Sequence, residues 1–209
     1  KVIADVVLAR TDGTPIHRFV VAIDEDDMGV THVFRGEDHL SNSPKQGLIF
    51  RALGLETPVY GHLPLILGPD GKRLSKRHGA TSVLAFRDEG YLPESMVNFL
   101  ARLGWSTEDS RDLFTRDELT QAFAIERVGK SPAIFDYVKL GWYNGHYLGL
   151  RSPGEKIALY RGYLGRAGYD EARFSDETLA ALFHHAGERV RTFAEAESYM
   201  AFALMEAPI

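Results

Sequence analysis

The sequence predicts an α/β segment over residues 1–70, followed by an all-α segment that reaches the end of the chain. Two observations carry this prediction. Short apolar and β-branched runs, which favour strands, all lie before residue 68. After residue 80 the apolar residues recur at helical spacing, between residues that are typical of caps and turns.

Strands and helices alternate in the α/β segment. A strand over 2–9 ends in a turn at 11–15, and a short helix over 17–23 runs into the acidic residues 24–27. A buried strand over 31–35, a helix over 38–53 that Gly54 ends, and a strand over 59–67 follow. This strand–helix–strand unit predicts a parallel pair of strands, and such sheets bind ligands at the carboxyl ends of their strands. We therefore expect residues 35–38 and the lysine-rich loop after Leu67 to face one crevice.

The all-α segment contains seven expected helices. Pro93 with Glu94 is typical of a first helical turn, and Ser131 with Pro132 is typical of a helix cap followed by proline. Residues 151–154 are the best candidate for a linker. The expected helices cover 82–89, 93–102, 115–123, 136–148, 154–167, 175–184 and 193–204.

Composition excludes several classes of protein. The chain has 209 residues, of which 44% are hydrophobic and 25% charged, the balance of an ordinary globular protein. No run of about 18 apolar residues is present, so we expect no membrane span. Cysteine is absent from the sequence, which excludes disulfides and thiolate zinc sites. The net charge of −5 does not by itself indicate a nucleic-acid partner, although basic residues cluster at 72–77.

The most informative segment is a loop that glycines bracket, from Gly68 to Gly79. Glycines let such a loop take backbone angles that are closed to other residues, and closely spaced cations bind phosphate oxygens. Composition alone leaves two interpretations open, a phosphate-binding loop and a solvated charged turn. The permanent cations of the loop are Lys72, Arg73, Lys76 and Arg77.

The order of residues in and around the loop favours the first interpretation. The run 73–77, Arg-Leu-Ser-Lys-Arg, resembles the KMSKS loop of class I aminoacyl-tRNA synthetases, in the form of the glutamyl and glutaminyl branch. Further segments are similar to bacterial glutamyl-tRNA synthetases, nearly continuously from residue 3 to 148 and more loosely beyond. The segments that carry this resemblance are 27–44, 90–94, 103–106, 126–128, 131–136 and 142–147.

The resemblance implies a function and a division of the chain. Residues 1–70 would be the C-terminal half of a Rossmann-type catalytic domain, 71–150 the KMSKS loop and stem-contact domain, and 151–209 the start of a truncated helical anticodon-binding domain. The complete enzyme would use ATP with Mg²⁺ to convert L-glutamate into glutamyl-adenylate, and would transfer glutamate to the 3′ end of tRNA(Glu). A cytoplasmic monomer without a zinc site in this segment is also implied.

Arg35 and His17 are implied as glutamate-binding residues. A guanidinium at the end of an apolar strand needs an anionic partner. The residues alone allow an ion pair with Glu37 or Asp38, whereas the resemblance implies the side-chain carboxylate of glutamate. His17 stands where members of the family usually have Tyr near the bound amino acid.

The resemblance implies an ATP site that combines residues 36–39 with Ile66 and the loop 73–77. Lys76, Arg73 and Ser75 would be catalytic, contacting the triphosphate and stabilising charge on the leaving pyrophosphate; Arg73 replaces the usual Lys. On the residues alone, Asp38 can instead cap the following helix, and Ile66 can be a core residue. The implied ATP-binding residues are Gly36, Asp38, His39, Ile66, Arg73, Leu74, Ser75, Lys76 and Arg77.

Three other patterns favour structural interpretations. The acids at 24–27 and the pair His184-His185 lack metal-ligand spacing, so we expect no metal site. Most aromatic residues of the helical region are expected in its core or interfaces rather than stacked on bases. These aromatic residues are Trp105, Phe135, Trp142, Tyr143 and Tyr147.

The chain begins at Lys1 and is interpreted as an internal piece of a longer protein. The His-Ile-Gly-His element and the first half of the nucleotide fold are absent from its sequence, so we expect no aminoacylation by this piece alone. A glutaminyl-tRNA synthetase, a glutamyl-queuosine tRNA(Asp) synthetase and a non-catalytic tRNA-binding module are the alternatives.

Overall fold

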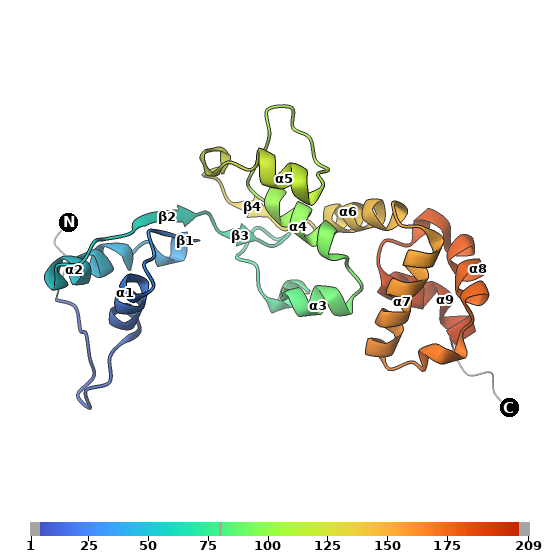
Figure 1. The fold of residues 1–209 in the computed structure, drawn as a ribbon, viewed down its shortest axis with the longest axis horizontal. Coiled ribbons are helices and arrows are strands. Elements are labelled where there is room, and N and C mark those ends of the chain that lie inside the picture. Colours follow the sequence, from blue (N-terminus) through green and yellow to red (C-terminus); the bar gives the residue numbers. More distant parts are fainter. Residues whose placement is uncertain (1–4, 80, 205–209) are drawn as a thin grey trace. The chain divides into compact units, whose positions relative to one another are not determined.

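A computed structural model describes residues 5–79 and 81–204, apart from the side chain of Glu188. The chain divides into two compact units (Figure 1). The described residues of unit 1 lie within Lys1–Leu65 and Lys130–Pro132, and those of unit 2 within Ile66–Gly129 and Ala133–Ile209.

Unit 1 is built on a two-stranded parallel sheet and two helices. Strands β1 (His32–Gly36) and β2 (Val59–Leu63) pair in parallel, so the predicted strand–helix–strand unit is confirmed. Helix α2 (Ser43–Leu53) connects the strands, and α1 (His17–Asp27) packs on α2. Gly54 ends α2 in the left-handed conformation, with φ of 73°, as the sequence predicts.

Three element predictions for this part of the chain are wrong in detail. Residues 5–8 form no strand, since Val7 and Leu8 stay exposed and no buried face rewards pairing; residues 2–4 lie outside the described residues. The helix expected from residue 38 begins at Ser43, because residues 37–39 form a separate 3-10 turn. The strand expected over 59–67 stops before Pro64, which has no N–H for a ladder hydrogen bond.

Unit 2 is mostly helical. Its one described sheet is the short parallel pair β3 (Ile66–Leu67) and β4 (Ala133–Ile134). All seven predicted helices are confirmed to within two residues at each end. Side-chain caps explain the starts of five of them: the side chains of Ser82, Thr115, Asp136, Ser152 and Ser175 accept first-turn N–H groups. The helices are α3 (Val83–Asp88), α4 (Pro93–Arg102), α5 (Arg116–Ala122), α6 (Tyr137–Gly149), α7 (Pro153–Ala167), α8 (Asp176–Ala186) and α9 (Phe193–Leu204).

Two local predictions in the helical region are wrong. Pro132 does not start a helix, because the chain continues into β4 and α6 starts only behind the cap Asp136. Residues 151–154 do not form a linker: Ser152 caps α7, and Pro153 is its first residue.

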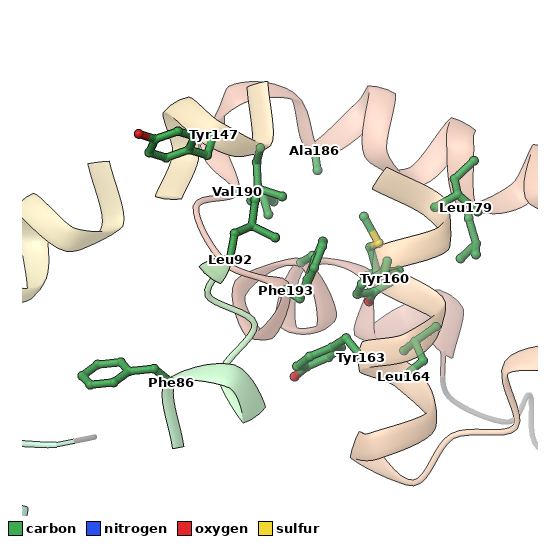
Figure 2. Packing of buried hydrophobic residues seen from close by; sticks show 14 of the residues in the cluster. Phe86, Leu92, Tyr147, Tyr160, Tyr163, Leu164, Leu179, Ala186, Val190 and Phe193 are labelled. Atoms are coloured by element: carbon green, nitrogen blue, oxygen red, sulfur yellow. The ribbon is translucent and has the colours of Figure 1, made fainter. Parts of the chain in front are cut away.

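One cluster of 21 buried residues joins α3 to α9 in unit 2. Figure 2 shows Tyr160, Tyr163 and Phe193 facing one another within it, with ring centroids of Tyr160 and Phe193 5.5 Å apart. Of the aromatic residues expected in the core, Phe135, Tyr143 and Tyr147 belong to this cluster, and Trp105 to a smaller one. Trp142 is the exception, since 45% of its surface is exposed.

Asn144 in α6 is the polar centre of this buried region. Its amide oxygen accepts hydrogen bonds from the Leu92 N–H (2.7 Å) and the Ser95 hydroxyl (2.6 Å), and its amide nitrogen donates to the Arg191 carbonyl. The side chain is fully buried. It therefore ties two separate segments, the start of α4 and the segment before α9, to α6. Across the described ranges, no helix is long and apolar enough to cross a membrane.

Candidate active site

Arg35 lies near the end of β1, and neutral groups hold its side chain. Its Nη2 donates to Ser43 Oγ (2.8 Å) and Gln46 Oε1 (2.6 Å), both on α2, and its guanidinium carbon lies 4.7 Å from the centre of the Tyr60 ring. Its Nε is buried and has no hydrogen-bond partner among the described residues. The two neutral acceptors fix the guanidinium without cancelling its charge.

The local alternative for Arg35, an ion pair with Glu37 or Asp38, is not formed. No carboxylate of the described residues lies within ion-pair distance of its guanidinium. Glu37 instead accepts a hydrogen bond from the Leu65 N–H at 3.3 Å. An arginine that is half-buried, held by neutral partners and left with one orphan N–H can bind an anionic ligand.

Two residues of β2, His62 and Tyr60, lie beside Arg35 and could not be assigned from sequence. His62 stands opposite Arg35 in the sheet, and its Nε2 lies 2.8 Å from Ser43 Oγ. Tyr60 donates to Glu25 at 3.1 Å; burial, and then the charge of Glu25, raise the pKa of Tyr60 to about 12, so its ring stays neutral beside the guanidinium. His62 can be assigned to the site only because it pairs with Arg35 across the two strands, and this register is visible only in the structure.

The turn after β1 is shaped by Gly36. A Cβ at this position would lie 2.5 Å from Asp38 Oδ1, so a glycine is needed for Asp38 to fold back over it. Asp38 does not cap α2, since Asn42 occupies the N-cap position. His39 contacts Asn42, with Nδ1 and Nδ2 3.2 Å apart. It is the last residue of the 3-10 turn 37–39 and not, as predicted, a residue at the start of α2.

His17 and the acidic residues 24–27 lie at the two ends of α1. His17 is the exposed first residue of α1, and within the described ranges its side chain makes no hydrogen bond, so no direct bond links it to Arg35. The acids at 24–27 form the last turn of α1, and Glu25 is engaged by Tyr60. No cluster of three or more His, Cys, Asp or Glu side chains that could hold a metal ion lies in the described part of the chain.

The lysine-rich loop, Gly68 to Gly79, belongs to unit 2. Backbone hydrogen bonds within the loop and to β3 form a frame that holds it. The Gly68 N–H donates to the Lys72 carbonyl (2.7 Å), and the Leu74 N–H to the Ile66 carbonyl (2.9 Å), which closes the loop as a hairpin on β3. Gly71 takes φ of 73° at its tip. Leu74 packs against the large buried cluster, and so anchors the loop by its side chain.

His78 closes the second half of the loop. Its Nδ1 accepts from the Ser75 N–H (3.0 Å) and lies 3.2 Å from Ser75 Oγ, while its Nε2 lies 3.1 Å from Asp70 Oδ1. Its side chain is only 9% exposed. The Lys72 N–H, and then His78, hold the pKa of Asp70 below its ordinary value, so Asp70 stays ionised opposite the imidazole.

The frame leaves the cations of the loop at the surface. Lys72, Lys76 and Arg77 are exposed, and no carboxylate of the described residues lies within 4.0 Å of their charged groups. Arg73 is also exposed and bridges to Leu67 through its backbone. A rigid backbone frame that presents several uncompensated cations can bind a polyphosphate. Arg35 to His39 lie in unit 1 and Ile66 to Arg77 in unit 2, so their sharing of one crevice stays a prediction.

The chain is similar to known proteins over most of its length. A family model described as tRNA synthetases class I (E and Q), catalytic domain, matches residues 1–142. The chain is 49% identical over 207 residues to a glutamate–tRNA ligase of Thermodesulfovibrio yellowstonii, covering 98% of this chain and 44% of the relative. A glutamate–tRNA ligase of Syntrophotalea carbinolica is 49% identical over 172 residues, 82% of this chain and 37% of the relative.

Solved structures give the same result for the fold. The glutamate-tRNA synthetase of Elizabethkingia anophelis superposes with a TM-score of 0.81 at 32% identity, covering 99% of this chain and 44% of that one. A glutamate tRNA ligase of Elizabethkingia meningosepticum, solved in complex with its amino acid, gives 0.79 at the same identity and coverage. The chain thus spans less than half the length of these relatives.

Proposed function

Because the chain belongs to the family of class I tRNA synthetases for glutamate and glutamine, we propose that it is part of a glutamate–tRNA ligase. The complete protein would activate L-glutamate with ATP to glutamyl-adenylate and would transfer glutamate to the 3′ end of tRNA(Glu). The fold of this part, an α/β segment followed by helices, is that of the corresponding part of solved glutamyl-tRNA synthetases.

The observation that carries the choice of glutamate is the environment of Arg35. Its guanidinium keeps a full charge, because Ser43 and Gln46 contribute only neutral oxygens. A carboxylate of the substrate side chain would complete the hydrogen bonding of Arg35, whereas the neutral amide of glutamine would leave the charge uncompensated. Arg35 is therefore our assignment for glutamate recognition, with His17 as a weaker neighbour.

The loop from Gly68 to Gly79 supports ATP as the second substrate. Lys76 and Arg73 would contact the triphosphate and stabilise charge on pyrophosphate as the glutamate carboxylate attacks the α-phosphorus. The P–O bond to pyrophosphate breaks as the new acyl–phosphate bond forms. Gly36, Asp38, His39 and Ile66, with Leu74, Ser75 and Arg77, are assigned to the same nucleotide.

Mg²⁺ fits this assignment as a companion of ATP rather than of the protein. The described residues offer no cluster of three oxygen or nitrogen ligands, so the ion would be held mainly by phosphate oxygens and water. When bound, it neutralises phosphate charge. The exposed cations of the loop do the same work from the protein side.

We propose functional regions and a location by analogy with the family. We assign residues 1–70 to the second half of the catalytic domain, 71–150 to the loop and stem-contact region, and 151–209 to the start of the anticodon-binding region. Protein synthesis places the complete protein in the cytoplasm, and we expect a monomer. This piece alone is expected to be inactive.

Charging of tRNA by the complete encoded protein tests the proposal. We expect glutamate, and not glutamine, to be esterified to tRNA(Glu) in the presence of ATP and Mg²⁺. Charging of glutamine would favour a glutaminyl-tRNA synthetase, and glutamate transfer to tRNA(Asp) would favour the queuosine-modifying type. Binding of tRNA without any adenylate formation would leave only a non-catalytic binding module.

A further inference from the structure

His62 lies on the same face of the β1–β2 sheet as Arg35. The two residues are paired in the register of the parallel strands, and paired residues project to the same side of a sheet. Tyr60, two residues before His62, shares that side: the centre of its ring lies 4.7 Å from the Arg35 guanidinium carbon and 6.5 Å from the centre of the His62 ring, on which it stacks. Strand pairing thus places a second polar side chain next to the arginine that we assign to glutamate.

Ser43, at the start of α2, joins the two side chains. A guanidinium has N–H donors and no acceptor, so Ser43 Oγ accepts the 2.8 Å hydrogen bond from Arg35 Nη2. The hydroxyl proton of Ser43 remains for the second contact, in which His62 Nε2 lies 2.8 Å from the same oxygen. The arrangement is that of a directed chain, in which Arg35 donates to Ser43 and Ser43 donates to His62.

The opposite polarity of the second bond would leave the hydroxyl unsatisfied. If His62 Nε2 carried the proton, Ser43 Oγ would accept two hydrogen bonds, and its own proton would have no acceptor among the described residues. Both contacts are partly buried, where a lost hydrogen bond is costly. The first polarity satisfies each group, and it requires a neutral imidazole with its proton on Nδ1.

The bond to His62 determines what Ser43 presents to Arg35. A serine hydroxyl rotates about its Cβ–Oγ bond, and its proton turns to the acceptor within reach. With His62 as that acceptor, a lone pair of Ser43 stays directed at Arg35 Nη2. Gln46, which is only 1% exposed, accepts the other hydrogen of Nη2 at 2.6 Å. The two acceptors thus engage both hydrogens of Nη2, while Nη1 makes no hydrogen bond within the described ranges and is left for a ligand.

We propose that His62 is a positioning residue for the substrate carboxylate: it holds the proton of Ser43, so that Ser43 and Gln46 keep the Arg35 guanidinium in one orientation. The inference rests on the proposed function for the role of Arg35. His62 acts through Ser43 and takes no part in the bond changes of adenylate formation. Its loss should therefore raise the KM for glutamate and leave kcat unchanged.

Glutamate-dependent ATP–pyrophosphate exchange by the complete encoded protein, with tRNA(Glu) present, tests the inference. His62→Phe keeps an aromatic ring and removes the acceptor, so we expect the KM for glutamate to rise about 5- to 10-fold, with kcat within about 2-fold. His62→Gln offers an amide oxygen in place of Nε2 and should bring the KM back to within about 3-fold of the unchanged protein. A fall in kcat with the KM retained, or a His62→Gln variant as impaired as His62→Phe, would overturn the inference.

A double-mutant cycle shows whether His62 acts through Ser43. Ser43→Ala removes the hydroxyl that bonds the charged guanidinium, and we expect the KM for glutamate to rise about 10-fold or more. If His62 works by holding the Ser43 proton, adding His62→Phe to Ser43→Ala should change the KM by less than about 2-fold. Effects that multiply in the double variant would show that His62 acts independently of Ser43, and the inference would then be wrong.

His32→Phe is the matched control, because His32 is also a strand histidine beside a hydroxyl. It is the first residue of β1, it is exposed, and its Nδ1 lies 3.0 Å from Thr31 Oγ1. We expect its loss to leave the KM for glutamate unchanged. Thermal melting followed by circular dichroism checks that each variant is folded. An equal rise of the KM in His32→Phe would attribute the effect to the sheet as a whole and overturn the inference.

Two readouts separate this inference from the proposed function. If Arg35→Ala raises the KM for glutamate and His62→Phe does not, the inference is overturned and the proposed function stands. If the unchanged protein shows no exchange with glutamate, the proposed function fails, and the role of His62 in substrate binding fails with it.

The tautomer of His62 can be measured without any activity. Nitrogen NMR of the complete protein, labelled at histidine and kept at mildly alkaline pH, distinguishes a proton on Nδ1 from one on Nε2, and His62→Gln identifies the signal by its loss. We expect the proton on Nδ1, and a shifted Nε2 signal in Ser43→Ala. A proton on Nε2 would overturn the inference even in a protein that activates glutamate.

Discussion

In unit 1 the Arg35 guanidinium is held by the neutral side chains of Ser43 and Gln46, whereas in unit 2 the Arg102 guanidinium lies 3.4 Å from the Asp112 carboxylate. Arg102 also donates to the Trp105 carbonyl at 2.8 Å, and its side chain is 11% exposed. Asp112 completes that arrangement by binding Lys139 and Tyr143. The chain thus satisfies one arginine internally and leaves the other for a ligand.

The two units also differ in how many hydrophobic residues they bury. Among the described residues, the hydrophobic cluster of unit 1 buries Ala22, Ile49 and Phe50, while the largest cluster of unit 2 buries 21 residues. We therefore expect stability to reside mainly in unit 2, whereas Arg35, the charge that we assign to substrate binding, lies in the sparsely buried unit 1. Polar substitutions should act on stability in unit 2 and on ligand binding in unit 1.

The largest expected effect is on stability, at Asn144. Removing its amide by Asn144→Ala leaves the buried Leu92 N–H and the partly buried Arg191 carbonyl without this partner. The Ser95 hydroxyl loses one of two bonds and keeps the one to the Leu92 carbonyl. Each such loss costs about 1–3 kcal/mol, so we expect about 3–5 kcal/mol in the free energy of unfolding. Urea unfolding followed by the fluorescence of the buried Trp105 measures it.

Asn42→Ala in unit 1 is the matched control for this prediction. Asn42 also makes two side-chain contacts, to Arg18 and His39, but it is only partly buried, so its loss should cost less than about 1 kcal/mol. Equal losses at the two asparagines would show that the contrast between the units is not one of burial.

Gln46→Glu, an isosteric change, should give Arg35 of unit 1 an internal ion pair of the kind that Arg102 has in unit 2. Gln46→Glu places a carboxylate where Oε1 now lies, 2.6 Å from Arg35 Nη2. The new ion pair would satisfy the guanidinium internally, and we expect the KM for glutamate to rise about 100-fold, with stability unchanged or increased. Steady-state charging by the complete protein measures this, and an unchanged KM would argue against Arg35 as the glutamate ligand.

His78 should matter for rate rather than for substrate binding. His78→Ala removes the bonds to Ser75 and the contact with Asp70 that fix the cationic loop, and we expect kcat of adenylate formation to fall about 10- to 100-fold. Gly68→Ala should act in the same way, since its Cβ would lie 2.9 Å from the His78 ring.

Gly47→Ala is the control for the glycine change, because position 47 is helical and has open space around it. It should leave kcat unchanged or stabilise α2 slightly. A change in the KM for glutamate, with kcat retained, would place His78 in a different role.

The smallest expected effect is the pH dependence that Asp112 confers on unit 2. Burial alone raises the pKa of Asp112, but hydrogen bonds from Lys139 and Tyr143 and the charges of Lys139 and Arg102 outweigh burial and lower it from 3.8. A lowered pKa contributes stability that is present above pH 3.8 and is lost as the pH falls through the folded-state pKa.

Asp112→Asn should therefore flatten the acid limb of the stability curve of unit 2, at a cost of about 1 kcal/mol at neutral pH. Urea midpoints from pH 2 to 7, again followed by Trp105, test the prediction. An acid limb as steep as that of the unchanged protein would assign the pH dependence to other carboxylates.

The helices were predictable from sequence because their signals are local. Ser82, Thr115 and Ser175 cap their helices by hydrogen bonds that span only three residues. The Pro132 prediction failed because β3, far away in sequence, pairs with the residues after it. The strand at 2–9 failed in its described part because no core receives Val7 or Leu8.

The site was predictable only in its charged groups. Arg35 and Lys76 are visible as cations in an apolar or glycine-rich context, and the resemblance to a family gave them roles. Ser43, Gln46 and His62 were missed because α2 and the β1–β2 register bring them to Arg35 from 8 to 27 residues away. A contact of that kind follows from tertiary packing, which a local pattern does not encode.

Glutamate-dependent ATP–pyrophosphate exchange, with tRNA(Glu) present, tests the central claim most directly. The complete protein would be compared with its Arg35→Ala and Lys76→Ala variants. We predict that Arg35→Ala raises mainly the KM for glutamate, by about 100-fold or more, and that Lys76→Ala lowers mainly kcat. Exchange driven by glutamine instead, or retained unchanged in both variants, would contradict the assignment of Arg35 to glutamate binding and of the Lys76 loop to ATP binding.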